Sequence, residues 1–123
     1  MRCARPKILI ISVIMIAMMA ISVDHFVLAQ GSEQVVRITA QRFFFRPDNV
    51  TLKKGIPAVF ELTSQDVVHG FNCPGLGIRS DIPPHKVTTI RFTPRNAGTF
   101  PFRCDVPCGS GHDRMTGTIT VVE

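Results

Sequence analysis

The chain reads QVVRITAQRFFFRPDNVTLKKGIPAVFEL over residues 34–62, where apolar and polar side chains alternate in short bursts. Within each burst an apolar residue recurs at every second position, as at Val36, Ile38, Ala40 and again at Val50 and Leu52. Successive side chains of a β-strand point to opposite faces of a sheet, so a period of two is typical of strands with one buried face. The stretch therefore predicts strands joined by turns.

The same pattern continues to the C-terminus. Turn-forming compositions separate the bursts at residues 47–49, 54–57 and 94–98, and later apolar bursts follow at 87–92, 99–103 and 116–122. No long helical pattern appears after Ala29. Six or seven short strands spaced by turns predict an all-β fold, an antiparallel Greek-key β-sandwich.

The first 29 residues have a different character. Basic residues Arg2, Arg5 and Lys7 precede an apolar run at 8–23, and small or aliphatic residues follow at 27–29. This order is typical of a secretory signal, and the run is shorter than the ~20 residues that cross a bilayer as a helix. A cleaved signal peptide over 1–29 is favoured, and a retained N-terminal membrane anchor is the alternative. Either way we expect a periplasmic or otherwise extracytoplasmic protein, attached to the cytoplasmic membrane if the segment is retained.

Composition suits one folded domain, residues 30–123. The chain has 123 residues, of which 45% are hydrophobic and 19% are charged, and this balance argues against disorder. Its net charge is +5, but after the leader only Lys53 and Lys54 form an adjacent basic pair, and the chain holds no Trp or Tyr. A nucleic-acid surface combines clustered cations with aromatic rings, so we expect no nucleic-acid partner.

Metal-ligand side chains gather near the C-terminus, in the segment CDVPCGSGHDRM at residues 104–115. It contains Cys104, Cys108, His112 and Met115, the only methionine after the leader. His69 lies upstream, just after a predicted strand, where a sandwich brings it beside this segment. Sulfur ligands with imidazole select copper or zinc, and the thioether favours copper because zinc sites rarely use methionine.

These residues allow three kinds of site. A mononuclear blue-copper site needs one cysteine, two histidines and a weak axial methionine, which Cys108, His69, His112 and Met115 supply. The second thiol, Cys104, instead suits two copper ions bridged by both sulfurs. A disulfide between the two cysteines is the third alternative, because the compartment is oxidising.

His69 followed by C-x-x-x-C-x-x-x-H-x-x-M resembles the binuclear CuA motif of subunit II of haem-copper oxidases, which nitrous oxide reductase shares. The likeness extends to residues 43–55, 63–71 and 74–83. It implies a cupredoxin-like CuA domain over 30–123 that holds two copper ions, with Cys104 and Cys108 as bridging thiolates. The remaining ligands are divided between the two metals: His69 and Met115 on one, His112 and the main-chain carbonyl of Val106 on the other.

The resemblance also implies a function. Such a centre carries single electrons, either in a free-standing carrier or in the domain of a cytochrome c oxidase that receives electrons. The expected partner is a cytochrome c or an oxidase core subunit, and no catalysis is expected from this chain alone. The chain is most similar to the single-anchor form of subunit II or to a soluble CuA protein.

A copper-delivery or copper-holding protein is the alternative, in which the same ligands bind Cu(I) for transfer. A carrier needs a closed site, whereas a donor needs an exposed one. Residues outside the motif carry simpler expectations: Cys73 as a buried core thiol, His85 as a surface residue, and the run 43–45 as core with one outward ring. Asp66 is expected to accept main-chain N–H groups, with a role in tuning His69 as the alternative.

Overall fold

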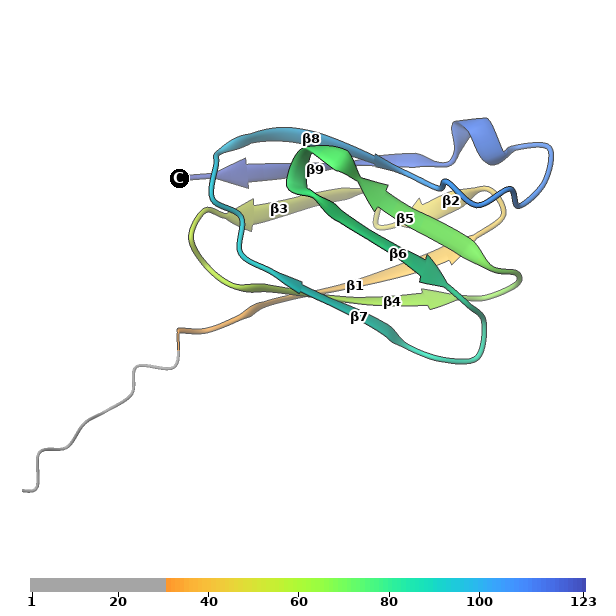
Figure 1. The fold of residues 1–123 in the computed structure, drawn as a ribbon, viewed down its shortest axis with the longest axis horizontal. Helices are drawn as coiled ribbons and strands as arrows, with labels where there is room; N and C mark the ends of the chain where they lie inside the picture. Colours follow the sequence, from red (N-terminus) through yellow and green to blue (C-terminus); the bar gives the residue numbers. More distant parts are fainter. Residues whose placement is uncertain (1–30) are drawn as a thin grey trace, which may run out of the picture. The chain divides into compact units, whose positions relative to one another are not determined.

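The computed structural model describes residues 31–123, which form two β-sheets packed face to face (Figure 1). The first sheet has the order β2-β1-β4-β7 and the second β3-β9-β8-β5-β6. Their strands are β1 (Gln34–Gln41), β2 (Phe44–Arg46), β3 (Asn49–Lys53), β4 (Ala58–Ser64), β5 (His69–Cys73), β6 (Ile78–Ile82), β7 (Thr88–Phe92), β8 (Gly98–Arg103) and β9 (Thr116–Val122). The expected all-β sandwich is confirmed, and the leader lies outside the described residues.

Helical structure within residues 31–123 is limited to two short 3-10 turns, η1 (Pro74–Leu76) and η2 (His112–Arg114). In this part of the chain no helix has the length and apolar character that a membrane span requires. Neither finding bears on the leader.

The strands expected from alternation are present as β1, β3, β4, β7, β8 and β9, but the antiparallel arrangement is wrong at two places. β1 pairs with β4 in parallel, and β3 pairs with β9 in parallel. Parallel neighbouring strands need a long crossover connection. Here the chain enters the other sheet between β1 and β4, and again between β3 and β9. Alternation reports which face of a strand is buried and carries no information about its partner's direction.

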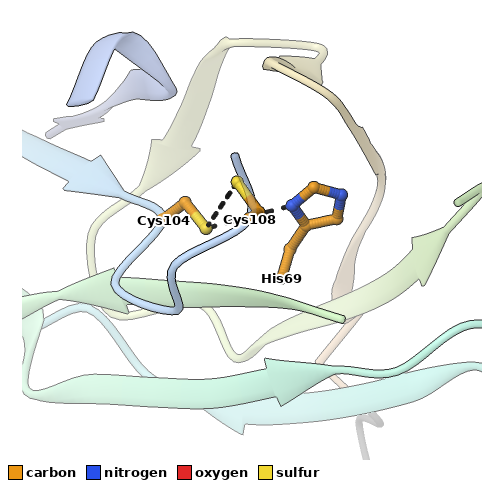
Figure 2. A group of neighbouring side chains, drawn as sticks. All are labelled: His69, Cys104 and Cys108. Atoms are coloured by element: carbon orange, nitrogen blue, oxygen red, sulfur yellow. Dashed lines mark hydrogen bonds between the residues drawn. The ribbon is translucent and has the colours of Figure 1, made fainter. Parts of the chain in front are cut away.

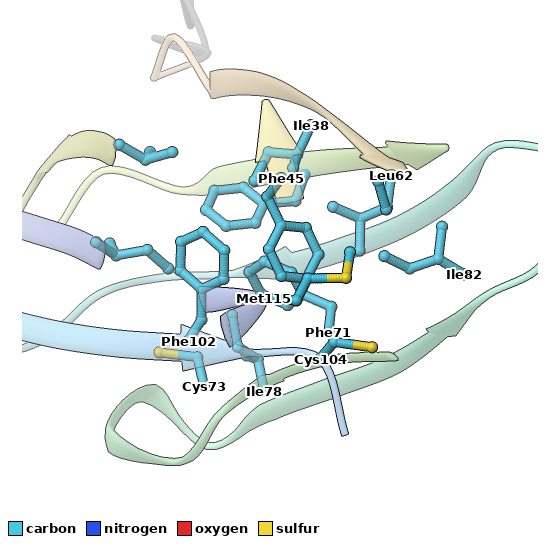
Figure 3. Packing of buried hydrophobic residues seen from close by; sticks show 14 of the residues in the cluster. Ile38, Phe45, Leu62, Phe71, Cys73, Ile78, Ile82, Phe102, Cys104 and Met115 are labelled. Atoms are coloured by element: carbon cyan, nitrogen blue, oxygen red, sulfur yellow. The ribbon is translucent and has the colours of Figure 1, made fainter. Parts of the chain in front are cut away.

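Phenylalanine rings from both sheets fill the middle of the sandwich (Figure 3). Phe71 on β5 and Phe102 on β8 stack with centroids 4.7 Å apart, and Phe45 on β2 meets Phe102 edge-on at 5.1 Å. Each such pair contributes about 0.5–1.5 kcal/mol beyond the burial of its area. The cluster therefore fixes β5 and β8, the two strands whose ends lie next to the residues expected as metal ligands.

Candidate metal centre

The segment between β8 and β9 starts and ends next to paired residues of the second sheet. Arg103 and Thr116 are the last paired residues of the two antiparallel strands, and the N–H of Cys104 donates to the carbonyl of Met115 at 3.0 Å. This bond holds the first and last ligand-type residues of the segment side by side. Twelve residues thus form a loop at one end of the sandwich, with little freedom at its two ends.

The start of β5 also contacts this loop. His69 follows β4 after a short connection and is itself the first residue of β5, and its side chain is fully buried. The N–H of Gly70 donates to Sγ of Cys104 at 3.3 Å. The start of β5 therefore lies directly against the first thiol of the loop.

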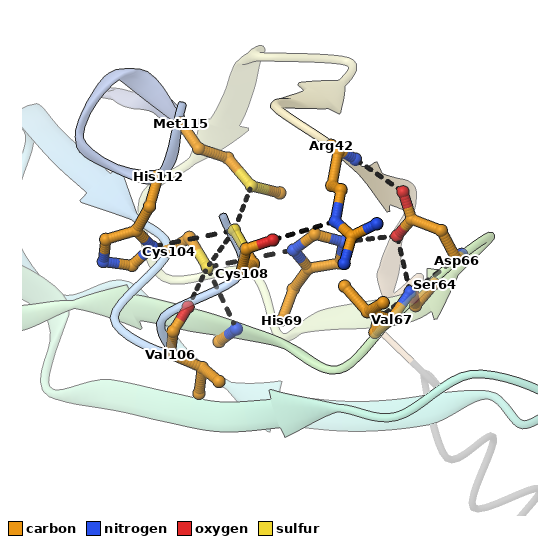
Figure 4. Close-up of polar contacts among 11 residues, drawn as sticks. Arg42, Ser64, Asp66, Val67, His69, Cys104, Val106, Cys108, His112 and Met115 are labelled. Carbon is orange, nitrogen blue, oxygen red and sulfur yellow. Dashed lines mark hydrogen bonds and ion pairs between the residues drawn. The ribbon is translucent and has the colours of Figure 1, made fainter. Parts of the chain in front are cut away.

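All six residues expected as ligands come together at this point (Figure 4), and Figure 2 shows three of them, His69, Cys104 and Cys108. The two sulfurs of Cys104 and Cys108 lie 3.9 Å apart. Nδ1 of His69 lies 3.9 Å from Cys104 Sγ, and Nδ1 of His112 lies 3.7 Å from Cys108 Sγ. The other two donors complete the group: Met115 Sδ at 3.9 Å from Cys108 Sγ and the Val106 carbonyl oxygen at 3.2 Å from Cys104 Sγ.

Both cysteines of the cluster are free thiols. Their separation of 3.9 Å is far longer than a disulfide bond of about 2.05 Å. Burial raises the pKa of the Cys108 thiol to about 11, and the neighbouring Cys104 sulfur adds to the effect. Because thiolates rather than thiols bind metal, we expect metal uptake to release protons.

Asp66 determines how His69 is oriented. Its Oδ1 lies 2.7 Å from Nε2 of His69, and its carboxylate also accepts the main-chain N–H groups of Arg42 and Val67, each at 2.7 Å. Partial burial opposes ionisation, but the hydrogen bonds from Arg42, His69 and Val67 outweigh it and hold the pKa of Asp66 at about 2. An imidazole that donates from Nε2 keeps Nδ1 free as a ligand, and Nδ1 is the atom that faces the thiols.

The donor set fits copper. Two thiols, two imidazoles and a thioether are soft or borderline donors, which copper prefers over hard cations such as magnesium or calcium. His69 and Met115 are fully buried, Cys104 and Cys108 are nearly so, and His112 is half-buried. The arrangement can therefore hold copper away from bulk water, with one imidazole near the surface.

Comparison with known proteins identifies the family of this chain. Residues 9–121 match the family of cupredoxin-like domains. The chain belongs to this family. The cupredoxin-like domain is 36% identical over 92 residues to cytochrome c oxidase subunit 2 of Thermus thermophilus, across 75% of this chain and 68% of that protein. It spans 55% of a second subunit 2 from the same species, so it corresponds to part of these proteins.

Solved structures with the same fold include an oxidase domain and a copper-binding domain. The periplasmic domain of cytochrome oxidase subunit II from Bradyrhizobium japonicum superposes with a TM-score of 0.68 at 20% identity, covering 73% of this chain and 84% of that one. At this identity the likeness is one of fold alone. The metal-binding domain of the Cu(I)-exporting ATPase of Streptococcus pneumoniae, solved with Cu(I), has a TM-score of 0.60 at 31% identity, covering 78% and 91%.

Residues outside the cluster follow the simpler expectations. Cys73 is a fully buried free thiol at the far end of β5 from His69, and His85 is exposed in a turn. Phe45 is core and Phe44 is 38% exposed, so the predicted run has one outward ring. Asp66 accepts main-chain N–H groups as expected, and its bond to His69 is the additional role.

Two residues of the site are missed by sequence reasoning. Nε of Arg42 donates to the carbonyl of Cys108 at 2.8 Å, and the ring of Phe43 lies against Gly109 and Gly111 of the loop. A Cβ built on Gly111 would lie only 2.4 Å from ring atoms of Phe43. No motif marks either residue, because both act on a segment more than sixty positions away.

Proposed function

We propose that this cupredoxin-like domain carries single electrons through a binuclear copper centre outside the cytoplasm. It acts either as the electron-accepting domain of a haem-copper oxidase or as a free-standing carrier. The observation that carries the proposal is the pair of buried free thiols 3.9 Å apart, each of which faces its own imidazole. A mononuclear site would need only one of these thiols.

The proposal gives each residue of the cluster a task. Cys104 and Cys108, once deprotonated, would bind both ions as shared thiolates. The other four donors divide as the resemblance implies, His69 with Met115 and His112 with the Val106 carbonyl. When bound, the copper pair supplies a site that takes up and releases one electron.

Burial and anchoring of the ligands favour an electron carrier. His69 is fixed by Asp66, Cys104 is pinned to Met115 through the main chain, and the aromatic core supports β5 and β8. Side chains held in this way keep one geometry in both oxidation states, which lowers the reorganisation that electron transfer requires. The chain's own contribution is thus to hold the donors still and to exclude water.

Relatives suggest where the domain works and with what. The chain covers 68% of cytochrome c oxidase subunit 2 of Thermus thermophilus, and the Bradyrhizobium subunit II domain is described as periplasmic. Together with the basic and apolar leader, this supports a periplasmic location with or without a single N-terminal anchor. The proposed partners are an oxidase core subunit and a donor such as a cytochrome c.

A copper-holding or copper-delivery role is the second candidate. The chain is 31% identical to the metal-binding domain of a Cu(I)-exporting ATPase and covers 91% of that domain. Free thiols with a thioether are also a suitable set for Cu(I), and the half-buried His112 gives one accessible edge. Reversible redox cycling distinguishes the two candidates, because a delivery site need only bind and release Cu(I).

Metal analysis with electron paramagnetic resonance of the purified, copper-loaded protein tests the proposal. We expect two coppers per chain, a purple oxidised form, and a hyperfine pattern from one unpaired electron shared equally by two nuclei. One copper with an intense blue mononuclear spectrum would overturn the binuclear site. Cu(I) that passes to a chelator and forms no stable oxidised state would support the delivery role instead.

A further inference from the structure

Arg42 joins two parts of the metal centre, although it is not itself a ligand-type residue. It lies in the turn between β1 and β2, and its Nε donates to the carbonyl oxygen of Cys108 at 2.8 Å. Its main-chain N–H donates to Oδ2 of Asp66 at 2.7 Å, and the other oxygen of Asp66 lies 2.7 Å from Nε2 of His69 (Figure 4). A continuous set of hydrogen bonds therefore runs from Cys108 to His69 through Arg42.

These contacts connect three separate segments of the chain. Cys108 belongs to the loop between β8 and β9, Asp66 to the connection between β4 and β5, and Arg42 to the β1–β2 turn. Arg79 of β6 also holds this loop, through two hydrogen bonds to Asp105 at 2.9 and 3.0 Å. Of these two arginines, Arg42 is the one whose contacts also reach His69.

Phe43, the next residue, holds the same loop by packing. Cβ atoms built on Gly109 and Gly111 would lie 2.8 and 2.4 Å from its ring, so the ring is pressed against the loop backbone. The β1–β2 turn thus contacts the loop in two ways, through a polar side chain and through an aromatic ring. The polar contact comes from the side chain of Arg42, and the aromatic contact comes from Phe43.

The charge of Arg42 matters as well as its hydrogen bond. A guanidinium remains protonated at every pH relevant to the folded protein, so its positive charge is permanent. It lies against the main chain of Cys108, one of the two thiols of the cluster. A fixed positive charge beside a metal favours the oxidation state that carries less positive charge, which is the reduced state.

We propose that Arg42 is a positioning residue of the metal centre, which couples the Cys108 loop to His69 and raises the reduction potential of copper held there. The effect on the reduction potential rests on the proposed function, whereas the connection between the Cys108 loop and His69 concerns the protein without metal. The two parts are therefore tested separately, one in the metal-free protein and one in the copper-loaded protein.

The first test uses hydrogen exchange in metal-free protein. Arg42→Met removes the guanidinium but keeps the main-chain N–H that binds Asp66. The matched control is Arg46→Met, since Arg46 is exposed on β2 and lies over the Phe44 ring at 5.5 Å. We expect amides of residues 108–112 to exchange several-fold faster in Arg42→Met and at the native rate in the control. Equal exchange in both variants would overturn the coupling.

The second test measures the ratio of reduced to oxidised copper-loaded protein in one redox buffer. Arg42→Gln keeps a donor for the Cys108 carbonyl but removes the charge, and Arg42→Lys keeps the charge. We expect the ratio to fall about threefold to tenfold in Arg42→Gln, in keeping with a single charge at a partly screened site, and to stay near native in Arg42→Lys. An unchanged ratio in Arg42→Gln would overturn the role of the charge.

The outcomes separate the inference from the proposed function. If the native protein binds no copper, the proposed function fails, and with it the effect on the potential. Faster exchange of residues 108–112 in Arg42→Met would in that case still establish that the Arg42 side chain holds the loop. If the native protein binds copper but neither exchange nor the redox ratio responds to Arg42, the inference fails and the proposed function stands.

Discussion

Nε2 of His69 lies 2.7 Å from Oδ1 of Asp66, on the side of the ring turned away from the thiols. A carboxylate that accepts from one imidazole nitrogen fixes both the tautomer and the ring plane. The other nitrogen then faces Cys104 at 3.9 Å. The orientation of the His69 ring is thus decided by a residue three positions earlier in the chain, and Asp66 is itself held by two main-chain N–H groups.

Asp66→Asn should therefore weaken copper binding. An amide has a single acceptor oxygen, so it loses either the bond from the Arg42 N–H, which reaches Oδ2, or those from Val67 and His69, which reach Oδ1. Its neutral oxygen also holds the His69 ring less firmly than a carboxylate does. Loss of such an outer partner typically lowers metal affinity about 10- to 100-fold. Competition with a Cu(I) chelator measures the change, and Asp81→Asn, an exposed carboxylate paired with Arg79 on β6, is the control. Equal affinities in the two variants would mean that Asp66 has no part in holding the ligand.

Acid should destabilise the metal-free domain through the same carboxylate. The folded-state pKa of Asp66 is lowered to about 2, so its hydrogen bonds add stability above the ordinary Asp range. That stability is lost as the pH falls from about 4 through about 2, because the unfolded state then takes up a proton that the folded state does not yet bind. Denaturant unfolding at several pH values should show a difference between native protein and Asp66→Asn at pH 6 that shrinks towards pH 2. A difference independent of pH would contradict this account.

Sequence patterns predicted the strands whose two faces differ. β1 and β3 alternate clearly because one face meets the core and the other meets solvent. β5 does not alternate, since four of its five residues are buried, and β2 has only three residues. Periodicity therefore cannot identify these two strands, although β5 carries His69.

The ligand-type residues were predictable because their chemistry is rare and their spacing is local. Cys104, Cys108, His112 and Met115 lie within twelve residues, so one loop must bring them together whatever the rest of the fold does. Arg42 and Phe43 form their contacts only after the β1–β2 turn and the β8–β9 loop meet at one end of the sandwich. Arginine and phenylalanine are common residue types, and nothing in the sequence sets these two apart.

Cys104→Ser separates a bridged copper pair from a single copper site. The change removes one sulfur and leaves His69, Cys108, His112 and Met115, which are sufficient for one copper. We expect one copper per chain and a mononuclear spectrum. Cys73→Ala is the matched control, because Cys73 is equally buried but lies at the far end of β5, and it should keep the native copper content. Two coppers with a native spectrum in Cys104→Ser would mean that Cys104 is not a ligand.

Met115→Leu distinguishes a weak metal ligand from a packing residue. Met115 is fully buried and its Sδ lies 3.9 Å from Cys108 Sγ. Leucine has nearly the same volume, so the cost in folding free energy should stay under about 1.5 kcal/mol. Copper should be retained, since thiolates and imidazoles supply most of the affinity, but loss of a sulfur donor destabilises the oxidised state. The reduction potential should rise by tens of millivolts; for one electron, ~59 mV corresponds to a tenfold change in the ratio of reduced to oxidised protein. An unchanged potential would mean that Met115 is a packing residue only.

Gly111→Ala tests whether the Phe43 ring clamps the metal-binding loop. The φ angle of Gly111 is −97°, a value open to any residue, so alanine there meets a steric obstacle rather than backbone strain. Its Cβ would lie 2.4 Å from the ring, and overpacking of this kind typically costs about 1–3 kcal/mol. Thermal unfolding should show that loss in the native background and a much smaller one beside Phe43→Ala, where the obstacle is gone. Gly31→Ala, with no atom within 4 Å of its Cβ, is the control and should be neutral. Should Gly111→Ala cost the same with and without the Phe43 ring, the ring would not be what holds the loop in place.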